Sequence, residues 1–314
     1  MDGTRKIVIV GAGAVGSTFA YTLMNSGLAS EIVLVDLDRP RAEAEAMDMN
    51  HGLFFAPPVE IHAGDYDDCA GAAVVVITAG ARQRPGESRL SLVQRNAAIS
   101  RSIVSDIVAR TRDAIIVMVT NPVDVLTYVA QEASGLPFGR VLGSGTVLDS
   151  ARLRFLLSRH CQVDPRNVHA YVLGEHGDSE VAAWSMVHIA GVRLDQYCRA
   201  CPKACPVSSY QDLFAQVRDS AYHVIESKGA TYYGVSMALE RIVGAVLRDE
   251  NSVLTVSTRA QGQYGLPDLC LSLPAVVNRT GVDRIVAAEL TEDEIAALRR
   301  SAQVLTGVIA QVKA

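Results

Sequence analysis

Short, unbroken runs rich in valine and isoleucine alternate with helical patterns through the first half of the chain. The runs, expected to be strands, lie at residues 6–10, 31–35, 73–77 and 115–119, and the helical patterns lie at 14–26, 40–51 and 90–110. Strands without polar alternation are typical of a parallel sheet that helices cover on both faces. Strand and helix in turn predict right-handed crossovers, and hence a doubly wound α/β sheet.

A different pattern begins after Gly143. Longer helices are expected at about 149–159, 211–227, 231–249 and 291–311, mixed with strands near 168–173, 252–257 and 269–273. The 314 residues suit two domains of about 150 residues each. We therefore predict a doubly wound domain over residues 1–143 and an α+β domain over residues 144–314.

Charge and hydropathy exclude several classes of protein. The 29 basic and 34 acidic side chains give a formal charge of −5, so no overall positive field attracts nucleic acid or an anionic membrane. The apolar runs are much shorter than the ~20 residues that span a bilayer. Residues 1–6 lead into the first expected strand without the apolar stretch of a signal peptide. We expect a cytoplasmic protein with neither a nucleic-acid nor a membrane partner.

A glycine-rich turn, Gly11-Ala-Gly13-Ala-Val-Gly16, joins the first expected strand to the first helix. Glycines there allow a tight turn, close approach of the backbone to a pyrophosphate and close helix–strand packing. Asp36 lies twenty residues after Gly16, at the end of the next strand, where a carboxylate accepts hydrogen bonds from ribose hydroxyls and repels a 2′-phosphate. The combination predicts a Rossmann domain that binds NAD rather than NADP; the alternative is that the glycines serve turns alone.

A histidine in Gly174-Glu-His176-Gly-Asp-Ser179 follows another expected strand. Histidine can give and take a proton near neutral pH, which hydride transfer to a carbonyl requires. Asp149 is a candidate partner, because a carboxylate on the far ring nitrogen would hold one tautomer and raise the pKa of the imidazole. A structural histidine is the alternative, and the sequence leaves the contact open.

Five motifs, in this order and spacing, resemble the L-lactate/malate dehydrogenase family. They are the glycine turn with Asp36, Thr120-Asn-Pro-Val-Asp124, Leu148-Asp-Ser-Ala-Arg152, Gly174-Glu-His-Gly-Asp-Ser179 and Lys228-Gly-Ala-Thr231. The resemblance covers nearly the whole chain. It implies an NAD-binding Rossmann domain, a second domain for substrate and subunit contacts, a homo-oligomer that is a tetramer, and hydride transfer.

The resemblance also implies the catalytic roles. His176 is similar to the proton donor and acceptor, and Asp149 to its orienting carboxylate. Arg152, at i+3 from Asp149 on the same helix face, resembles the residue that binds the substrate carboxylate through two parallel hydrogen bonds. Arg89 resembles the residue of a mobile loop that polarises the reacting carbonyl.

The remaining site residues come from the same resemblance. Asn121 is similar to the residue that hydrogen-bonds the carbonyl oxygen and also contacts the cofactor, and Thr231 lines the substrate side. Val15 and Gly80 complete the cofactor-binding set with the glycine turn and Asp36. A helix cap or a satisfied loop side chain is the alternative for Asn121 and Thr231.

The choice of acid depends on Gln83, six residues before Arg89, where malate dehydrogenases carry an arginine. A buried, unpaired second carboxylate costs several kcal/mol, so glutamine favours pyruvate over oxaloacetate. This predicts the lactate branch of the family, which interconverts pyruvate and L-lactate with NAD. Arg82 and Arg84 flank Gln83, so a loop shifted by one residue would favour malate. A bulkier 2-oxo acid is a further alternative.

A second anion site is expected at Arg154 and His169. Arg154 is two residues past Arg152 and leaves the opposite side of the helix. Residues at these two positions resemble those that bind fructose 1,6-bisphosphate across a subunit two-fold in activated bacterial lactate dehydrogenases. We therefore expect activation by this bisphosphate. A surface arginine and a strand histidine without a regulatory role are the alternative.

Two other classes of function compete. An NAD-sensing module would keep the glycine turn but would not need Arg89, Asp149, Arg152 and His176. A zinc site could begin at the Cys-x₂-Cys of Cys198-Arg-Ala-Cys201-Pro-Lys-Ala-Cys205, with Cys161 as a fourth ligand. No second pair follows at zinc-ribbon spacing. We expect no metal, and reduced thiols on an exposed loop over residues 198–208.

Overall fold

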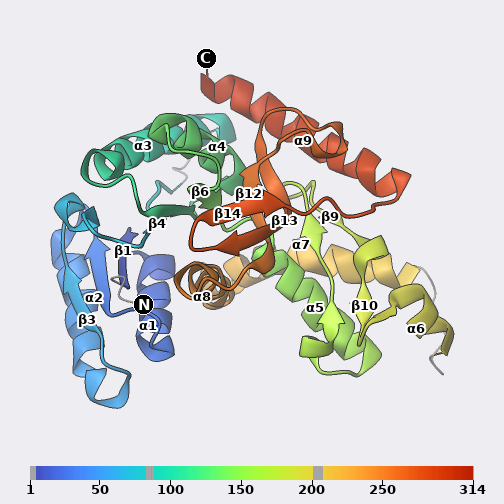
Figure 1. Ribbon diagram of the computed structural model, residues 1–314, viewed down its shortest axis with the longest axis horizontal. Helices are drawn as coiled ribbons and strands as arrows, with labels where there is room; N and C mark the ends of the chain where they lie inside the picture. Colours follow the sequence, from blue (N-terminus) through green and yellow to red (C-terminus); the bar gives the residue numbers. More distant parts are fainter. Residues whose placement is uncertain (1–4, 83–85, 87, 201–207, 314) are drawn as a thin grey trace.

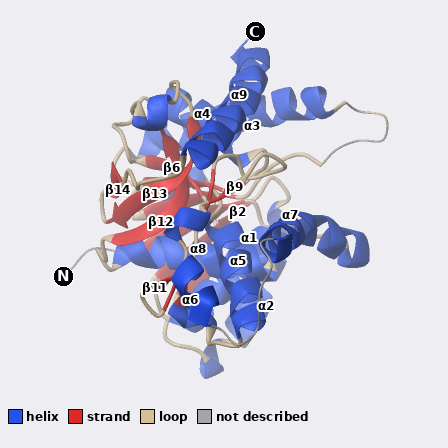
Figure 2. Cartoon of the chain, turned by 90° about the vertical axis from the view of Figure 1, so that its right-hand side faces the viewer, coloured by secondary structure: helices blue, strands red, loops and turns tan. Residues whose placement is uncertain are grey.

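The computed structural model describes residues 5–82, 86, 88–200 and 208–313 (Figure 1). Within these ranges the largest sheet has nine strands, in the order β14-β13-β12-β6-β5-β4-β1-β2-β3. Helices lie on both sides of its strands in the side view (Figure 2). The prediction of a Rossmann-type parallel sheet followed by a mixed α/β half is confirmed.

Six parallel strands form the amino-terminal part of the sheet. They are β1 (Lys6–Val10), β2 (Glu31–Val35), β3 (Glu60–Ala63), β4 (Val74–Ile77), β5 (Ile115–Met118) and β6 (Val141–Gly143). Alternate side chains of β1 enter two different cores, because Val8 packs on one face of the sheet and Ile7 on the other. Burial of both faces explains why these strands lack polar alternation. The sequence prediction missed β3 and β6, which are short.

Among the described residues, four helices cover this half. They are α1 (Ala14–Ser26), α2 (Arg39–His51), α3 (Arg89–Arg110) and α4 (Val123–Ser134). Helix α1 begins at Ala14, within the glycine-rich motif, and Asp38 caps α2 by accepting a hydrogen bond from the backbone N–H of Arg41 at 3.3 Å. The sequence prediction missed α4, which begins three residues after Thr120.

The carboxyl-terminal half adds three antiparallel strands to the same sheet. β12 (Ser252–Arg259) pairs with β6 through Ser257 and Gly143, and β13 (Cys270–Asn278) and β14 (Gly281–Ile285) follow outward. The sheet is therefore continuous across residue 143, and the domain limits 1–143 and 144–314 stay a prediction. The large helices of this half are α5 (Val147–Cys161), α7 (Ser208–Lys228), α8 (Tyr233–Leu247) and α9 (Glu292–Lys313). Helix α8 packs against α1 (Figure 1).

Two small sheets stand beside α5. One contains β7 (Val168–His169), β10 (His188–Ile189) and β11 (Val192–Arg193), and the other β8 (Val172–Leu173) and β9 (Val181–Ala182). The single strand expected near 168–173 is thus divided between two sheets. Single 3₁₀ turns lie at Leu53–Phe55, Tyr66–Cys69, Pro165–Asn167, Trp184–Met186 and Gln263–Gly265.

The prediction of a loop over residues 198–208 is partly wrong. Helix α6 (Leu194–Ala200) contains Cys198, and α7 begins at Ser208. Cys201 and Cys205 lie outside the described residues.

None of the helices in the described ranges is both long and apolar enough to cross a membrane.

Candidate active site

The glycine turn between β1 and α1 has the geometry of a phosphate cradle. Gly11 has φ +109°, and a Cβ there would lie 2.6 Å from the backbone N of Ala79. A Cβ on Gly16 would lie 1.8 Å from the carbonyl oxygen of Gly11, so close packing of helix and strand requires glycine at both positions. Gly13 differs, because nothing lies within 4 Å of its Cβ position. That open space at a helix N-terminus fits a pyrophosphate.

Asp36 follows β2 and lies against this turn. Its Oδ2 accepts a hydrogen bond from the backbone N–H of Ala12 at 2.6 Å, and its Oδ1 accepts one from Asp38 at 2.9 Å. Half-buried Val15 packs onto the core below α1. Gly80 is exposed, and a Cβ there would lie 2.3 Å from Cγ2 of Thr120. The residues present therefore fit a dinucleotide with free ribose hydroxyls.

The structure brings together three of the predicted catalytic residues. Asp149 lies in the first turn of α5 and is 2% exposed. Its Oδ2 is 2.6 Å from Nδ1 of His176, and its Oδ1 accepts a hydrogen bond at 2.8 Å from Arg152, one turn further along the helix. His176 reaches this carboxylate from the loop between β8 and β9. One buried carboxylate thus binds both an imidazole and a guanidinium.

The contact between Asp149 and His176 determines whether the imidazole is charged. Burial alone would lower the pKa of His176, but the charge of Asp149 and its hydrogen bond outweigh burial and raise that pKa to about 9. Burial also acts against ionisation of Asp149, yet His176 and Arg152 hold its pKa below the usual value. At neutral pH the imidazole is therefore protonated. With Nδ1 engaged by Asp149, Nε2 is the nitrogen that can transfer a proton.

Arg89 is the first residue of α3, where the sequence suggested a mobile loop, and it is exposed. It lies close enough to Tyr222 of α7 to lower the pKa of that phenol, against the larger, raising effect of Asp178. The Tyr222 hydroxyl donates to Asp178 Oδ1 at 2.9 Å. Because Asp178 is two residues from His176, the start of α3 lies on the same side of the molecule as the histidine loop.

The other predicted substrate residues have no described hydrogen bond to the catalytic cluster of Asp149, Arg152 and His176. Asn121 is exposed before α4, and its carbonyl oxygen accepts a hydrogen bond from Asn96 at 3.3 Å. Thr231 is half-buried between α7 and α8. No described hydrogen bond joins either side chain to His176. Gln83 lies outside the described residues.

Two acidic residues near His176 received no role from the sequence. Asp124, in the first turn of α4, accepts a hydrogen bond at 2.7 Å from the backbone N–H of His176. Glu180 is 7% exposed, and burial followed by the charge of Asp149 raises its pKa to about 8. The Thr120–Asp124 motif contained the first residue, whereas nothing in the sequence distinguished Glu180.

Arg154 and His169 lie away from the catalytic cluster. Arg154 donates from Nε to the carbonyl oxygen of Ala170 at 3.0 Å, and its guanidinium is 5.1 Å from the ring centroid of Tyr171. It lines a cavity of about 330 Å³ together with Arg241. Exposed His169 on β7 adjoins Ala170. Arg152 and Arg154 therefore make their contacts in different places.

The described part of the cysteine segment contains Cys198, whose thiol has a hydrogen-bond partner. The Tyr210 hydroxyl donates to Sγ of Cys198 at 2.8 Å. Within the described parts of the chain, no group of three or more His, Cys, Asp and Glu side chains could hold a metal ion. Because Cys201 and Cys205 are not among these residues, the expectation of no metal stays a prediction.

Known proteins resemble this chain over its full length. The L-lactate dehydrogenase of Thermoanaerobacter pseudethanolicus is 55% identical over 308 residues, covering 98% of this chain and 99% of that protein. The L-lactate dehydrogenase of Acetivibrio thermocellus is 52% identical, covering 97% of this chain and 96% of that protein. A solved lactate dehydrogenase structure from a Medee basin deep-sea metagenome library is 43% identical, with a TM-score of 0.97 and complete coverage of both chains.

The matches to family descriptions agree with these relatives. Residues 5–143 match the NAD binding domain of lactate/malate dehydrogenase, and residues 146–314 match its alpha/beta C-terminal domain. The predicted NAD cofactor is thereby confirmed, together with the predicted class of oxidoreductase. The chain belongs to the lactate/malate dehydrogenase family.

Proposed function

We propose that this chain is an NAD-dependent L-lactate dehydrogenase, which interconverts pyruvate and L-lactate with His176 as the proton donor and acceptor. The observation that carries the proposal is the cluster in which Asp149 binds both His176 and Arg152. It provides a protonated imidazole beside a guanidinium, which suits a substrate with a carbonyl next to a carboxylate. Relatives named L-lactate dehydrogenase, at 55% and 52% identity, support the choice of substrate.

The side chains divide the work of pyruvate reduction. When bound, NADH supplies the hydride for the carbonyl carbon. Arg152 binds the substrate carboxylate through two parallel hydrogen bonds. His176 donates the proton on Nε2 to the carbonyl oxygen, while Asp149 stabilises the imidazolium before transfer and fixes the tautomer after it. In lactate oxidation the same nitrogen takes the proton back.

Three further residues act on the carbonyl side. Arg89 polarises the carbonyl from the start of α3 as charge develops on its oxygen. Asn121 hydrogen-bonds the carbonyl oxygen, and Thr231 lines the substrate side. These roles follow the family resemblance, and the nearness of Arg89 to Tyr222 supports the first of them.

The direct test is a substrate panel with purified chain, measuring NADH and NADPH oxidation with pyruvate, oxaloacetate and 2-oxo acids of increasing size. We expect pyruvate with NADH to give the highest kcat/KM. Absence of turnover with every acid would favour an NAD-sensing module. A preference for oxaloacetate would support the malate alternative.

Gln83→Arg tests the choice of acid. The new cation can pair with the second carboxylate of oxaloacetate, so the ratio of kcat/KM for oxaloacetate to that for pyruvate will rise by about two to four orders of magnitude. Arg82→Gln is the control for a shifted register and should leave the ratio unchanged. An unaltered ratio in Gln83→Arg, or a loss of oxaloacetate activity in Arg82→Gln, would contradict the assignment.

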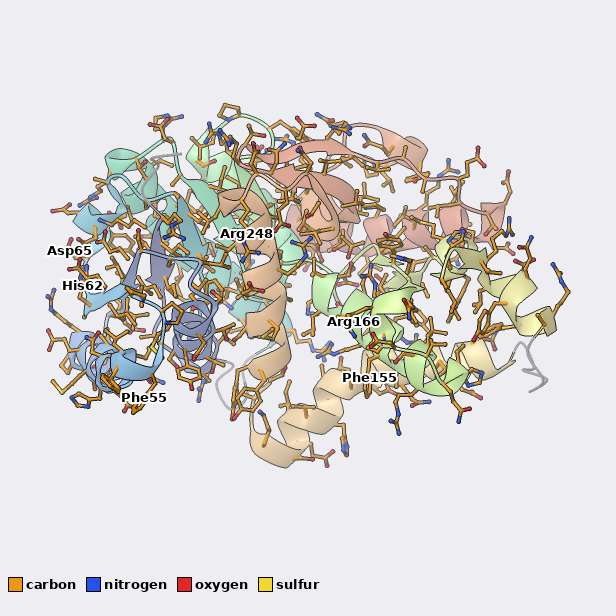
Figure 3. The ribbon with its side chains drawn as sticks, turned by 60° about the horizontal axis from the view of Figure 1, so that its bottom comes forward. Phe55, His62, Asp65, Phe155, Arg166 and Arg248 are labelled. Carbon is orange, nitrogen blue, oxygen red and sulfur yellow. The ribbon has the colours of Figure 1, made fainter. Side chains whose placement is uncertain are left out.

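We also propose a homotetramer in which Arg154 and His169 bind fructose 1,6-bisphosphate across a two-fold axis. Several large apolar side chains are exposed, including Phe54 at 91% after α2. Phe55, at 85%, and Phe155 on α5, at 56%, are exposed as well (Figure 3). A second copy that covers them would remove apolar surface from water. Phe155 adjoins Arg154, so the proposed anion site would lie near such a surface. The cytoplasmic location stays a prediction.

Activation is tested with pyruvate saturation curves at several pH values. Fructose 1,6-bisphosphate should lower the half-saturating pyruvate concentration about 5- to 150-fold, and light scattering should show a tetramer in its presence. Arg154→Gln should abolish the effect. Arg166→Gln is the matched control, because Arg166 is an exposed arginine of the same half that pairs with Asp164. Identical curves with and without the bisphosphate would remove the proposal.

A further inference from the structure

Asp124 is a buried carboxylate that the mechanism above does not use. It is 1% exposed and lies in the first turn of α4, where the helix dipole favours a negative charge. Its Oδ2 accepts a hydrogen bond at 2.7 Å from the backbone N–H of His176, a residue 52 positions away. The main chain of the histidine is thus bound to α4, while its ring is bound to Asp149 on α5.

The rest of the surroundings of Asp124 is unusual. Its Oδ1 and the Ser257 hydroxyl on β12 are both buried. Ser257 is near enough to lower the pKa of Asp124, but among the described residues neither oxygen has a partner of full hydrogen-bond geometry. A buried oxygen without a full set of hydrogen bonds costs stability. A carboxylate kept in such a place points to a requirement for its charge or its position.

Charged side chains from several neighbouring elements act on His176 and Asp124. Asp149 and Glu180 face His176 and raise its pKa, as Asp124 does, whereas Arg152 adjoins Asp149. Burial is the largest influence on Asp124 and raises its pKa to about 6, against the lowering effects of Ser257 and His176. Glu175 also raises this pKa, and the buried thiol of Cys270 on β13 lies within electrostatic reach. Asp124 is therefore ionised at neutral pH.

We propose that Asp124 is a positioning residue that fixes the main chain of His176 to α4 and gives the imidazolium a second negative charge. The inference rests on the proposed role of His176 as proton donor. Helix α4 also follows Asn121, three residues before Asp124, which we propose to bind the substrate carbonyl oxygen. One carboxylate therefore couples the positions of two groups that meet the same oxygen.

Asp124→Asn separates the charge from the position. The asparagine oxygen can still accept from the His176 N–H, but the negative charge is lost. We expect the fall of kcat/KM for pyruvate at alkaline pH to begin about one pH unit lower than in the wild type. At neutral pH kcat should stay within about threefold, because the loop is still held in place.

Asp124→Ala removes the charge and the hydrogen-bond acceptor together. A loop no longer fixed to α4 misplaces the proton donor, so kcat should fall about a hundredfold at every pH. Thr127→Val is the matched control, because Thr127 is buried one turn along α4 and its hydroxyl donates to the carbonyl oxygen of Val123 at 2.7 Å, within the helix itself. It should lower Tm and leave the pH profile unchanged.

An NMR titration of the wild-type protein keeps the proposal testable if a variant does not fold. The amide proton of His176 should follow the ionisation of Asp124, with a midpoint near pH 6, while the His176 ring titrates near pH 9. An amide shift that stays flat from about pH 4.5 to pH 7.5, or an Asp124→Asn profile identical to that of the wild type, overturns the proposal. Wild-type protein without pyruvate turnover would instead overturn the proposed function, and the amide titration would still report on Asp124.

Discussion

Replacing His176 with asparagine will lower kcat for pyruvate reduction by about two to four orders of magnitude, the usual contribution of a general acid. Asparagine is close in size to the first part of the histidine side chain, and its amide can donate to Asp149. It cannot release a proton to the substrate. NADH binding, followed by the fluorescence of the bound cofactor, should be unchanged because the glycine turn lies elsewhere. Steady-state kinetics at neutral pH measure the effect.

The control for this variant is His188→Asn. His188 is a half-buried histidine on β10 whose Nδ1 lies 3.0 Å from the carbonyl oxygen of Met186. We expect its kcat to stay within about twofold of the wild type. A His176→Asn enzyme that keeps wild-type kcat would show that another group supplies the proton.

Replacing Arg152 with lysine will lower kcat/KM for pyruvate by about two to three orders of magnitude. Lysine keeps the positive charge beside Asp149, so the buried carboxylate still has a partner. It loses the planar pair of donors that can bind a carboxylate through two parallel hydrogen bonds. Weakening a buried charge-assisted pair costs about 2–5 kcal/mol, and every 1.4 kcal/mol is about tenfold. The measurement is kcat/KM for pyruvate beside the Kd of NADH.

Arg154→Lys is the matched control for this substitution. The two arginines are two residues apart on α5, but Arg154 contacts Ala170 and Tyr171 rather than Asp149. Without bisphosphate, Arg154→Lys should therefore leave kcat/KM for pyruvate nearly unchanged. Equal losses in both variants would mean that damage to α5, and not loss of the carboxylate contact, explains the Arg152 result.

The sequence predicted the parallel strands well because they are buried on both faces. Helix α4 was missed for a different reason. Its first seven residues, Val123–Val129, are mostly β-branched and aromatic side chains, which favour strands in a sequence pattern. The continuation of the sheet into β12–β14 was not visible either, because buried antiparallel strands have the same apolar pattern as strands of a separate domain.

The part of the site that is held together by contacts between side chains could be predicted from the sequence. The i+3 spacing of Asp149 and Arg152 placed both on one helix face, and the structure joins them to His176. The contact of Asp124 was not predictable, because it binds a backbone N–H and any residue could stand at the donor position. The loop prediction at Cys198 was wrong because the prolines of that segment begin only after Ala200, so they do not prevent α6.

The pH dependence of pyruvate reduction tests the central claim that Asp149 keeps His176 protonated. The raised pKa means that the charged pair stabilises the fold fully below about pH 6.5, the ordinary value for histidine, and loses this contribution as pH rises through about 9. Pyruvate reduction requires the same protonated form. Arg152→Lys should lower the whole profile without moving it.

The deciding measurement is log kcat/KM for pyruvate against pH in the wild type and in Asp149→Asn. The wild-type profile should be level at neutral pH and fall tenfold per unit above about pH 9. In Asp149→Asn the fall should begin well below pH 9, because the largest charge that opposes burial is lost and only the smaller effects of Asp124 and Glu180 remain. Profiles that fall at the same pH in both proteins would contradict the account.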